Sequence, residues 1–366
     1  MVVFFFLFIT VLVLLSFNDT KTLISIDRQI YIVCVIFLGI LIFVTYLFLL
    51  SKQNLFQSDM MAYFSNLQNV HYLISFNTLP EVLKQVEFEK GFLILQVIVG
   101  YLTNNVQVYA LIMYSLILLL PLIAAGFYFG LDSVPFVMIH YVFFNIFNTV
   151  SLIVIRQGIA IGILLIALTI YLRGQKKVAI VLMLLAAQYH STAYIMLIAF
   201  LIIKFFRFKL KLIIVLWIIA AISYLTDWNQ KIIQLLPFNS QYILSYTGDL
   251  WSQQSAMYGQ EPNSIKYLFY SMIFLIIILI LRRFCSNDKD LLLLVKMYTI
   301  WNTLFLMFGF IAFSSRIALY SWFLFPFIVF YVFWKNKLLK TYYPVLLLVW
   351  VMVGLVSMPI FGWKAI

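Results

Sequence analysis

Residues 30–50 read IYIVCVIFLGILIFVTYLFLL, an almost entirely apolar run without a charged side chain. A helix rises about 1.5 Å per residue, so a run of this length crosses the roughly 30 Å hydrocarbon core of a bilayer. Residues 265–281 form a second long apolar run. Strands of an outer-membrane barrel would instead alternate between apolar and polar positions. The two runs therefore predict membrane-spanning helices.

The rest of the chain has the same character. Of its 366 residues, 65% are hydrophobic and only 10% are charged, whereas about a quarter of an ordinary soluble domain is charged. No stretch between the apolar runs is long enough for a separate soluble domain of about 100 residues. Residues 1–17 lack the basic start and the small-residue cleavage site of a signal peptide, so we expect a retained first span. The predicted fold is an all-α, polytopic integral membrane protein with one transmembrane domain over residues 1–366.

The number of spans follows from the lengths of the apolar runs, since a span needs about 20 residues or somewhat fewer. Ten runs are read as single spans: 2–17, 30–50, 106–130, 134–149, 157–172, 212–225, 265–281, 291–313, 317–334 and 344–361. The run at 92–102 is too short to cross and is read as re-entrant. The run at 178–203 is read as two short arms. The total is about twelve transmembrane helices.

Basic residues fix the orientation of these spans. The net charge of +12 would suggest a nucleic-acid partner in a soluble protein, but the basic residues lie in short clusters between apolar runs, so we expect no nucleic-acid binding. By the positive-inside rule, four clusters are cytoplasmic: Arg173–Lys177, Lys204–Lys211, Arg282–Lys289 and Lys335–Lys340. Two long polar segments, 51–91 and 226–264, then become extracytoplasmic loops. Both chain ends fall outside.

The run at 178–203 lies between two cytoplasmic clusters, so the chain must cross toward the outer face of the membrane and return to the cytoplasmic side. Its only polar cluster is Gln188–Thr192, which we expect to form the tip of a helical hairpin. His190 in this tip could act as an acid, a base or a donor to a phosphate or sugar oxygen. The alternative is a histidine that only satisfies the broken backbone.

Two arginines sit at the outer ends of apolar runs. Arg156 and Arg316 carry planar guanidinium groups that match phosphate oxygens two at a time, which suggests a lipid-linked phosphate as partner. Either arginine could instead reach to the lipid headgroups or pair with a structural carboxylate.

The first outer loop places carboxylates beside aromatic rings, in Ser58–Tyr63 and again in Glu87–Phe92. That combination suits sugars, because rings cover C–H groups and carboxylates accept from hydroxyls. Asp59, Tyr63 and Glu89 are candidates, and Glu89 stands out because Gly91 would allow a tight turn beside it. Solvated loop charge is the alternative reading for each carboxylate.

Several chemistries are not indicated. No phosphate-binding Gly-rich loop, dinucleotide fingerprint, Gly-x-Ser-x-Gly or His-Glu-x-x-His motif occurs. No two histidines have metal-ligand spacing, and Cys34 and Cys285 are not placed to form an extracytoplasmic disulfide. We therefore expect no metal, no cofactor and no nucleotide-driven pump.

Four motifs together carry a resemblance to a known family. Arg156–Ala160 (RQGIA), Ala186–Ser191 (AAQYHS), the Glu-x-Gly-Phe at Glu89–Phe92 and the Arg-x-x-x-Tyr at Arg316–Tyr320 resemble those of EpsG-type, Wzy-like bacterial polysaccharide polymerases. The resemblance covers roughly residues 50–325. Lys90 stands where the family usually has Pro, and Ser58-Asp59 where a Gly-Thr-Asp-like motif is common.

This resemblance implies an architecture like that of the GT-C membrane glycosyltransferases and an active site at the outer face of the bacterial inner (plasma) membrane. The implied enzyme transfers a growing glycan from undecaprenyl diphosphate to an incoming lipid-linked repeat unit. Glu89 or His190 would be the general base, and Arg156 and Arg316 would hold the leaving diphosphate. Sugar contacts would come from Asp59, Tyr63, Gln157 and Tyr320. Implied partners are the lipid-linked oligosaccharide, membrane lipid, a flippase and a chain-length regulator, for O-antigen, lipopolysaccharide, capsule or exopolysaccharide.

Two other functions stay open. A flippase for lipid-linked sugars would need charges deep in the spans and pseudo-symmetric halves, whereas only Lys296 looks deep and no repeat is detectable. A membrane sugar O-acyltransferase would need a different arrangement of His and Arg, with an Arg-x-x-Arg pair.

Overall fold

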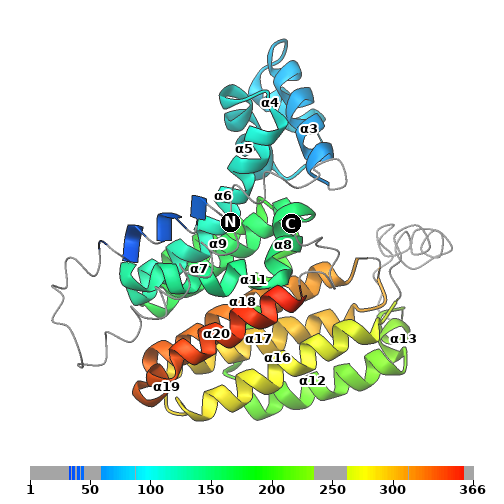
Figure 1. Ribbon diagram of the computed structural model, residues 1–366. Helices are drawn as coiled ribbons and strands as arrows, with labels where there is room; N and C mark the ends of the chain where they lie inside the picture. The colour runs from blue at the N-terminus through cyan, green and yellow to red at the C-terminus, as the bar shows by residue number, and fades with distance from the viewer. Residues whose placement is uncertain are drawn as a thin grey trace. The chain divides into compact units, whose positions relative to one another are not determined.

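The computed structural model describes residues 59–86, 88–234, 262–311 and 313–357, with scattered positions between 33 and 44. Throughout these parts the regular elements are helices, without a strand (Figure 1). The chain divides into two compact units, Met1–Tyr194 with Phe333–Ile366, and Ile195–Val332. The first expected span (2–17) and most of the second (30–50) lie outside the described residues.

Within the described residues, five helices are long and apolar enough to cross a membrane: α6 (Val106–Phe129), α9 (Ile155–Leu172), α16 (Ile265–Arg283), α17 (Lys289–Met307) and α18 (Ser315–Lys335). Four shorter apolar helices accompany them: α5 (Lys90–Leu102), α11 (Ala193–Phe206), α12 (Leu210–Leu225) and α20 (Tyr343–Ser357). The prediction of an all-helical integral membrane protein is confirmed. The described helices give five or six spans, so the predicted count of about twelve spans is not confirmed.

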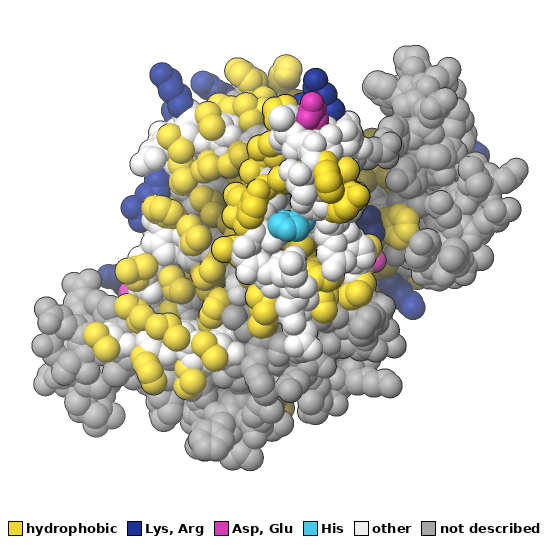
Figure 2. Space-filling view, turned by 90° about the horizontal axis from the view of Figure 1, so that it is seen from above, with side chains coloured by type: hydrophobic (Ala, Val, Ile, Leu, Met, Phe, Trp, Pro, Cys, Tyr) yellow, Lys and Arg dark blue, Asp and Glu magenta, His cyan; other side chains and the backbone are white. Residues whose placement is uncertain are grey.

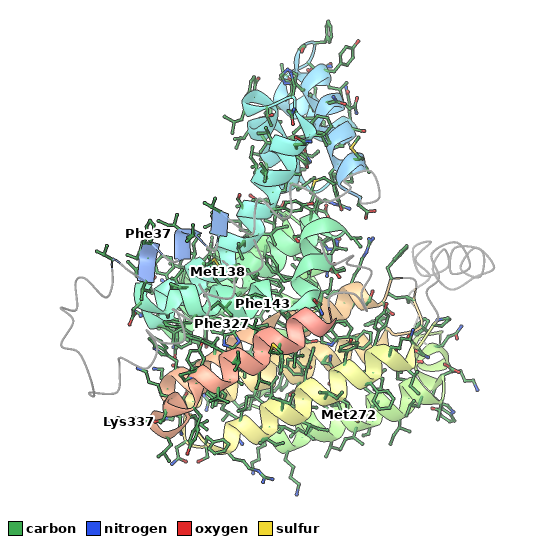
Figure 3. All side chains as sticks on the ribbon, in the orientation of Figure 1. Phe37, Met138, Phe143, Met272, Phe327 and Lys337 are labelled. Carbon is green, nitrogen blue, oxygen red and sulfur yellow. The ribbon has the colours of Figure 1, made fainter. Side chains whose placement is uncertain are left out.

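The expected span at 134–149 is not one straight helix. A 3-10 turn η2 (Leu131–Ser133) leads into α7 (Val134–Val142), which is bent by 81° against α8 (Asn145–Leu152). Figure 3 labels Phe143 at this bend. Its carbonyl oxygen lies so close to Gly354 of α20 that a Cβ there would approach it to 2.4 Å. The chain at the bend and α20 therefore make close backbone contact.

The centre of the first unit is made by α6, α9 and α10 (Lys176–Ala187), with α9 packed against both others. Gly158 and Gly162 lie one turn apart on α9, and a Cβ at Gly162 would come within 2.5 Å of Leu120 on α6. Such small residues let membrane helices approach closely, where dispersion contacts replace the missing hydrophobic drive. Asn105 caps α6 by accepting from the amides of Gln107 and Val108 at 2.8 and 3.2 Å.

Much of the expected first outer loop is helical. It contains α3 (Met60–Ile74) and α4 (Leu79–Gln85), followed by α5. Val70, Val82 and Leu93 form a buried apolar cluster that ties these three helices together. The Glu81 carboxylate accepts from the Thr78 amide at 2.8 Å and from its hydroxyl at 2.9 Å, which fixes the start of α4. The segment is therefore a small helical subdomain.

In the second unit, α17 packs against α12 and α16. The short helix α13 (Trp228–Gln234) follows α12 and also contacts α17. The expected span at 317–334 corresponds to α18. In the first unit, the short helix α19 (Lys337–Thr341) precedes α20, in which the last expected span, 344–361, begins. The run at 291–313 is helical only to Met307, because a turn with Gly309 against the Tyr224 ring follows.

Figure 2 shows many apolar side chains exposed on the described part of one face, as expected where helices face lipid. Only 28% of the span in α16 is buried, against 78% of the span in α9. The exposed side chains of α16 include Ile265, Phe269, Ile273, Ile276 and Ile280. Since water would penalise such a surface, these faces are suited to contact lipid.

Candidate active site

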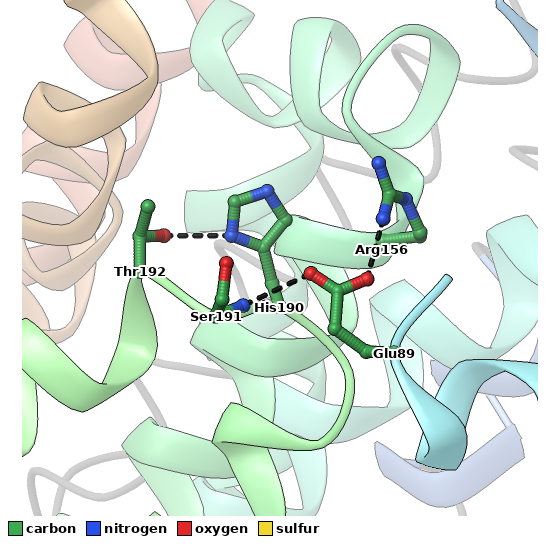
Figure 4. A network of polar contacts seen from close by, with 5 residues as sticks. All are labelled: Glu89, Arg156, His190, Ser191 and Thr192. Atoms are coloured by element: carbon green, nitrogen blue, oxygen red, sulfur yellow. Dashed lines mark hydrogen bonds and ion pairs between the residues drawn. The ribbon is translucent and has the colours of Figure 1, made fainter. Parts of the chain in front are cut away.

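Three segments of the first unit meet at one polar site (Figure 4). Glu89 precedes α5, Arg156 is the second residue of α9, and Ser191 lies in the break between α10 and α11. The side chains of Arg156 and Glu89 are 20% and 19% exposed. The pair is thus partly buried, and a charge interaction at such a position is stronger than in bulk water.

The carboxylate of Glu89 is held by both oxygens. Its Oε2 forms an ion pair with Nη1 of Arg156, and its Oε1 accepts a hydrogen bond from the backbone amide of Ser191 at 3.0 Å. A positive charge in the first turn of a helix is unfavourable because the helix dipole is positive there. The carboxylate offsets that cost for Arg156.

The backbone brings α5 and the break at 188–192 into contact. The amide of Phe92 donates to the carbonyl of Gln188 at 3.2 Å, and a Cβ at Gly91 would lie only 2.8 Å from that same oxygen. The expected tight turn at Gly91 is wrong, since Gly91 lies inside α5 and has no positive φ. The glycine is needed for close approach of two backbones.

Three aromatic rings surround the guanidinium. The Cζ atom of Arg156 lies 4.4 Å from the centroid of the Phe88 ring, 5.9 Å from that of Tyr63 and 6.0 Å from that of Phe92. Phe92 contacts both other rings edge-on. Cation–π attraction and ring packing restrict the guanidinium to one place. Its Nε is buried and makes no hydrogen bond within the described structure.

The environment favours the charged form of Glu89. Burial raises the pKa of this carboxyl, but the Arg156 charge, the amides of Glu89 and Ser191, and the His190 charge lower it more, and the pKa ends below its ordinary value. In this state Glu89 is a weak base, because its negative charge is already compensated.

His190 lies beside the pair, as the prediction of a shared site requires (Figure 4). Its Nδ1 is 2.7 Å from the hydroxyl oxygen of Thr192. The helical arms predicted around Gln188–Thr192 are confirmed, because α10 ends at Ala187 and α11 begins at Ala193. That the second arm returns to the starting side of the membrane stays a prediction.

The site lies at the opposite end of α9 from a basic turn. The start of α9 and the residues after α10 both contact Glu89, while Arg173, Lys176 and Lys177 mark the turn that joins the two helices. Eighteen residues of helix measure about 27 Å. The site and the basic turn are therefore separated by roughly the thickness of a bilayer core.

The other predicted site residues are placed differently. Tyr63 is part of the ring cluster, while Gln157 follows Arg156 but is 1% exposed. Asp59 precedes α3, and its carbonyl accepts from the Tyr63 amide at 3.1 Å. Arg316 and Tyr320 belong to the second unit. That Arg316 converges with Arg156 stays a prediction.

In the second unit, Arg316 lies with its Cζ 4.5 Å from the centroid of the Phe313 ring. Tyr320 is fully buried and packs edge-on against Trp301. Both residues stay predicted substrate contacts.

Sequence reasoning missed three parts of the site. Phe88 and Phe92 were predicted only as rings for sugar binding, whereas both contact the guanidinium of Arg156, the ionic partner of Glu89. The Ser191 amide was missed because a backbone donor has no signature in side-chain chemistry. In the part of the chain that the structure describes, no three His, Cys, Asp or Glu side chains are grouped as for a metal ion.

These observations define a helical membrane protein with an arginine–carboxylate pair at one end of a spanning helix. The sequence profile of the EpsG family matches residues 36–365. The chain belongs to this family, the family of Wzy-like polysaccharide polymerases, which implies a polymerase-like function on lipid-linked oligosaccharides. No curated protein and no solved structure matches the chain.

Proposed function

We propose that the protein is a repeat-unit polymerase, a glycosyltransferase that moves a growing glycan from undecaprenyl diphosphate to an incoming lipid-linked repeat unit. The observation that carries this is the Arg156–Glu89 pair, a guanidinium and a carboxylate held at one end of a spanning helix in a chain of this family. A diphosphate leaving group needs the first of these groups, and an attacking hydroxyl needs the second.

The proposed step requires no nucleotide sugar. The carboxylate of Glu89 takes the proton of the acceptor hydroxyl, whose oxygen bonds to the anomeric carbon of the donor sugar. The bond from that carbon to the diphosphate oxygen breaks, and its electron pair leaves with the diphosphate. Arg156 neutralises this developing charge with its planar donors. His190 is the second candidate for the base, since an imidazole exchanges protons near neutral pH.

The remaining residues complete the proposed substrate site. Arg316 supplies a second cation for the diphosphate, and Asp59, Tyr63, Gln157 and Tyr320 contact sugar hydroxyls and ring faces. A flippase would deliver the substrate and a chain-length regulator would act on the product. The product class is an O-antigen, a capsule or an exopolysaccharide.

The proposed location is the bacterial inner membrane, with about twelve spans and the site at the outer face. The basic turn after α9 supports this orientation, because basic turns stay in the cytoplasm while the site lies about 27 Å away along α9. Single cysteines at 175 and 209 should react only from the cytoplasm, and one at 190 only from outside. Labelling of 175 or 209 from outside would contradict the proposal.

The function is tested with purified protein and a lipid-linked repeat unit in proteoliposomes. A ladder of products that differ by one repeat is expected, and a deletion strain should accumulate a single repeat. Transfer of intact repeat units across the bilayer without lengthening would identify a flippase instead and overturn the proposal.

The base assignment is tested by Glu89→Gln and His190→Ala at matched expression. Loss of a general base reduces turnover about 10²- to 10⁴-fold, and we expect the larger loss for Glu89→Gln. If both variants turn over like the unmodified protein, neither residue is the base.

A further inference from the structure

The surroundings of the Glu89 carboxylate form an anion site. It is built from the guanidinium of Arg156 and the backbone amide of Ser191, which both donate to that carboxylate. The rings of Phe88 and Phe92 hold the guanidinium from the side, so its donors remain directed at the anion. Two converging donors of this kind are what a phosphate oxygen requires.

We propose that Glu89 occupies the diphosphate site in the resting protein, and that a bound diphosphate takes its place on Arg156 and the Ser191 amide. The proposal rests on the proposed function for the identity of the diphosphate. A carboxylate and a phosphate oxygen compete for the same donors, so both cannot be held at once. The exchange therefore couples two events, donor binding and release of Glu89.

The release has a chemical consequence for Glu89. While it is paired with Arg156, its charge is compensated and it attracts a proton weakly. Once a diphosphate holds Arg156, the freed carboxylate lies beside a polyanion, and that raises its affinity for the acceptor proton. The base becomes active only when a donor is bound. Activated hydroxyls, water included, are thus not produced at an empty site.

Two features of the pair are compatible with this exchange. The Arg156 Nε makes no hydrogen bond within the described residues, so Glu89 does not use every donor of the guanidinium. Glu89 precedes α5 outside any regular helix, with φ of −60° and ψ of 136°, and its side chain is 19% exposed. Rotation of the carboxylate away from Arg156 requires no unfolding of α5.

The test measures binding of inorganic pyrophosphate by calorimetry to the full chain in phosphatidylcholine nanodiscs. Glu89→Gln should bind pyrophosphate about three- to tenfold more tightly than the unmodified protein, because the competing charge is gone. Arg156→Ala should lose binding. Glu81→Gln is the matched control, since it removes the same charge from the same helical subdomain, and within the described residues its carboxylate bonds only Thr78. Its affinity should stay unchanged.

Equal tightening in Glu89→Gln and Glu81→Gln would overturn the proposal, because it would show general charge repulsion. Weaker binding in Glu89→Gln would overturn it as well, since Glu89 would then assist the diphosphate. A second arm adds phosphatidylglycerol to the nanodiscs. Pyrophosphate affinity should not change, whereas loss of pyrophosphate binding would assign the site to membrane lipid headgroups.

Binding and turnover are measured separately. If pyrophosphate binding follows the expected order but no product ladder forms, the exchange stands and the polymerase function fails. If a ladder forms but Glu89→Gln binds no more tightly, the function stands and the exchange fails. In the assay, Glu89→Gln should show a lower KM for donor together with a lower kcat.

Discussion

Two polar regions of the molecule differ in charge and in how completely they are bonded. In the second unit, Asn302 accepts from the indole of Trp217 at 2.7 Å and donates to the hydroxyls of Ser271 and Ser321 at 2.9 Å each. Trp322 donates to the same Ser271 hydroxyl at 3.0 Å. This network is neutral, and Asn302, Ser271 and Ser321 are fully buried.

The site in the first unit has the opposite properties. Glu89 and Arg156 are charged and about one-fifth exposed, and one donor of Arg156 makes no bond among the described residues. A buried polar group in an apolar surrounding is costly unless it is bonded, so a fully bonded neutral network fixes four helices. A charged, incompletely bonded pair contributes little to architecture and is suited to exchange its partner. The Asn302 network should therefore govern the stability of the fold, and the Arg156–Glu89 pair should govern turnover.

The largest expected effect is on turnover at Arg156. Arg156→Lys keeps the charge but loses the planar fork, so polymerisation in the reconstituted assay should fall about 10²- to 10³-fold, as when a transition-state donor is removed. The Tm should change little. Arg173→Lys is the control, because Arg173 lies at the other end of the same helix and donates to the Tyr128 carbonyl at 2.9 Å. Full activity in Arg156→Lys would remove the arginine from the mechanism.

The reverse pattern is expected at Asn302. Asn302→Leu leaves the Trp217 indole without its acceptor, so the free energy of unfolding should drop by about 1–3 kcal/mol. Turnover per folded molecule should stay unchanged. Thr299→Val on the same helix is the control, since among the described residues the Thr299 hydroxyl bonds only the carbonyl of Val295, one turn earlier, at 2.8 Å. Measured Tm values and active-site concentrations separate the two effects. An Asn302→Leu protein of normal Tm would contradict the contrast between the regions.

A smaller effect is expected at Phe88. Its ring lies 4.4 Å from the Arg156 Cζ, and such an interaction contributes about 0.5–1 kcal/mol at a partly exposed position. Phe88→Leu should therefore lower kcat/KM roughly two- to fivefold, and Phe88→Tyr should restore it. Phe76→Leu is the control, because Phe76 is an exposed ring that contacts Tyr72. If Phe88→Leu and Phe76→Leu reduce kcat/KM equally, the ring does not position Arg156.

The sequence predicts the two regions unequally. Glu89, Arg156 and His190 could be identified because charged and polar residues interrupt apolar runs, and the break at 188–192 followed from the basic clusters on either side. The bend between α7 and α8 could not be predicted, because the few polar residues of this mostly apolar run form no periodic pattern that shows a change of direction. With 37 Phe and 23 Tyr in the chain, the rings around Arg156 were not distinguishable from lipid-facing ones.

The Asn302 network was missed for a related reason. Its members are single polar residues within apolar runs, and nothing in their spacing shows that four helices bring them together. Which unit a residue contacts is a tertiary property. This is why Arg316 and Tyr320 could be chosen from a motif but not positioned relative to Arg156.

The smallest expected effect is the pH dependence of stability from Glu89. Burial raises the pKa of this carboxyl, but Arg156 and two amides favour the charged form more strongly. The pKa in the folded protein is therefore below its ordinary value of 4.5. A lowered folded pKa contributes stability that is fully present above the unfolded pKa and is lost as pH falls through the folded pKa. The Tm of the unmodified protein should therefore exceed that of Glu89→Gln at pH 7, and the difference should shrink below about pH 4.5. We expect a difference on the order of 1–2 °C, because water screens a partly exposed pair.

The contribution of Glu81, whose pKa is also lowered by bonds to Thr78, is common to both proteins and cancels. Tm values of both proteins in the same detergent from pH 7 to pH 3 measure the difference, and one that stays constant or widens on acidification would mean that Glu89 is not held by its ionic partner.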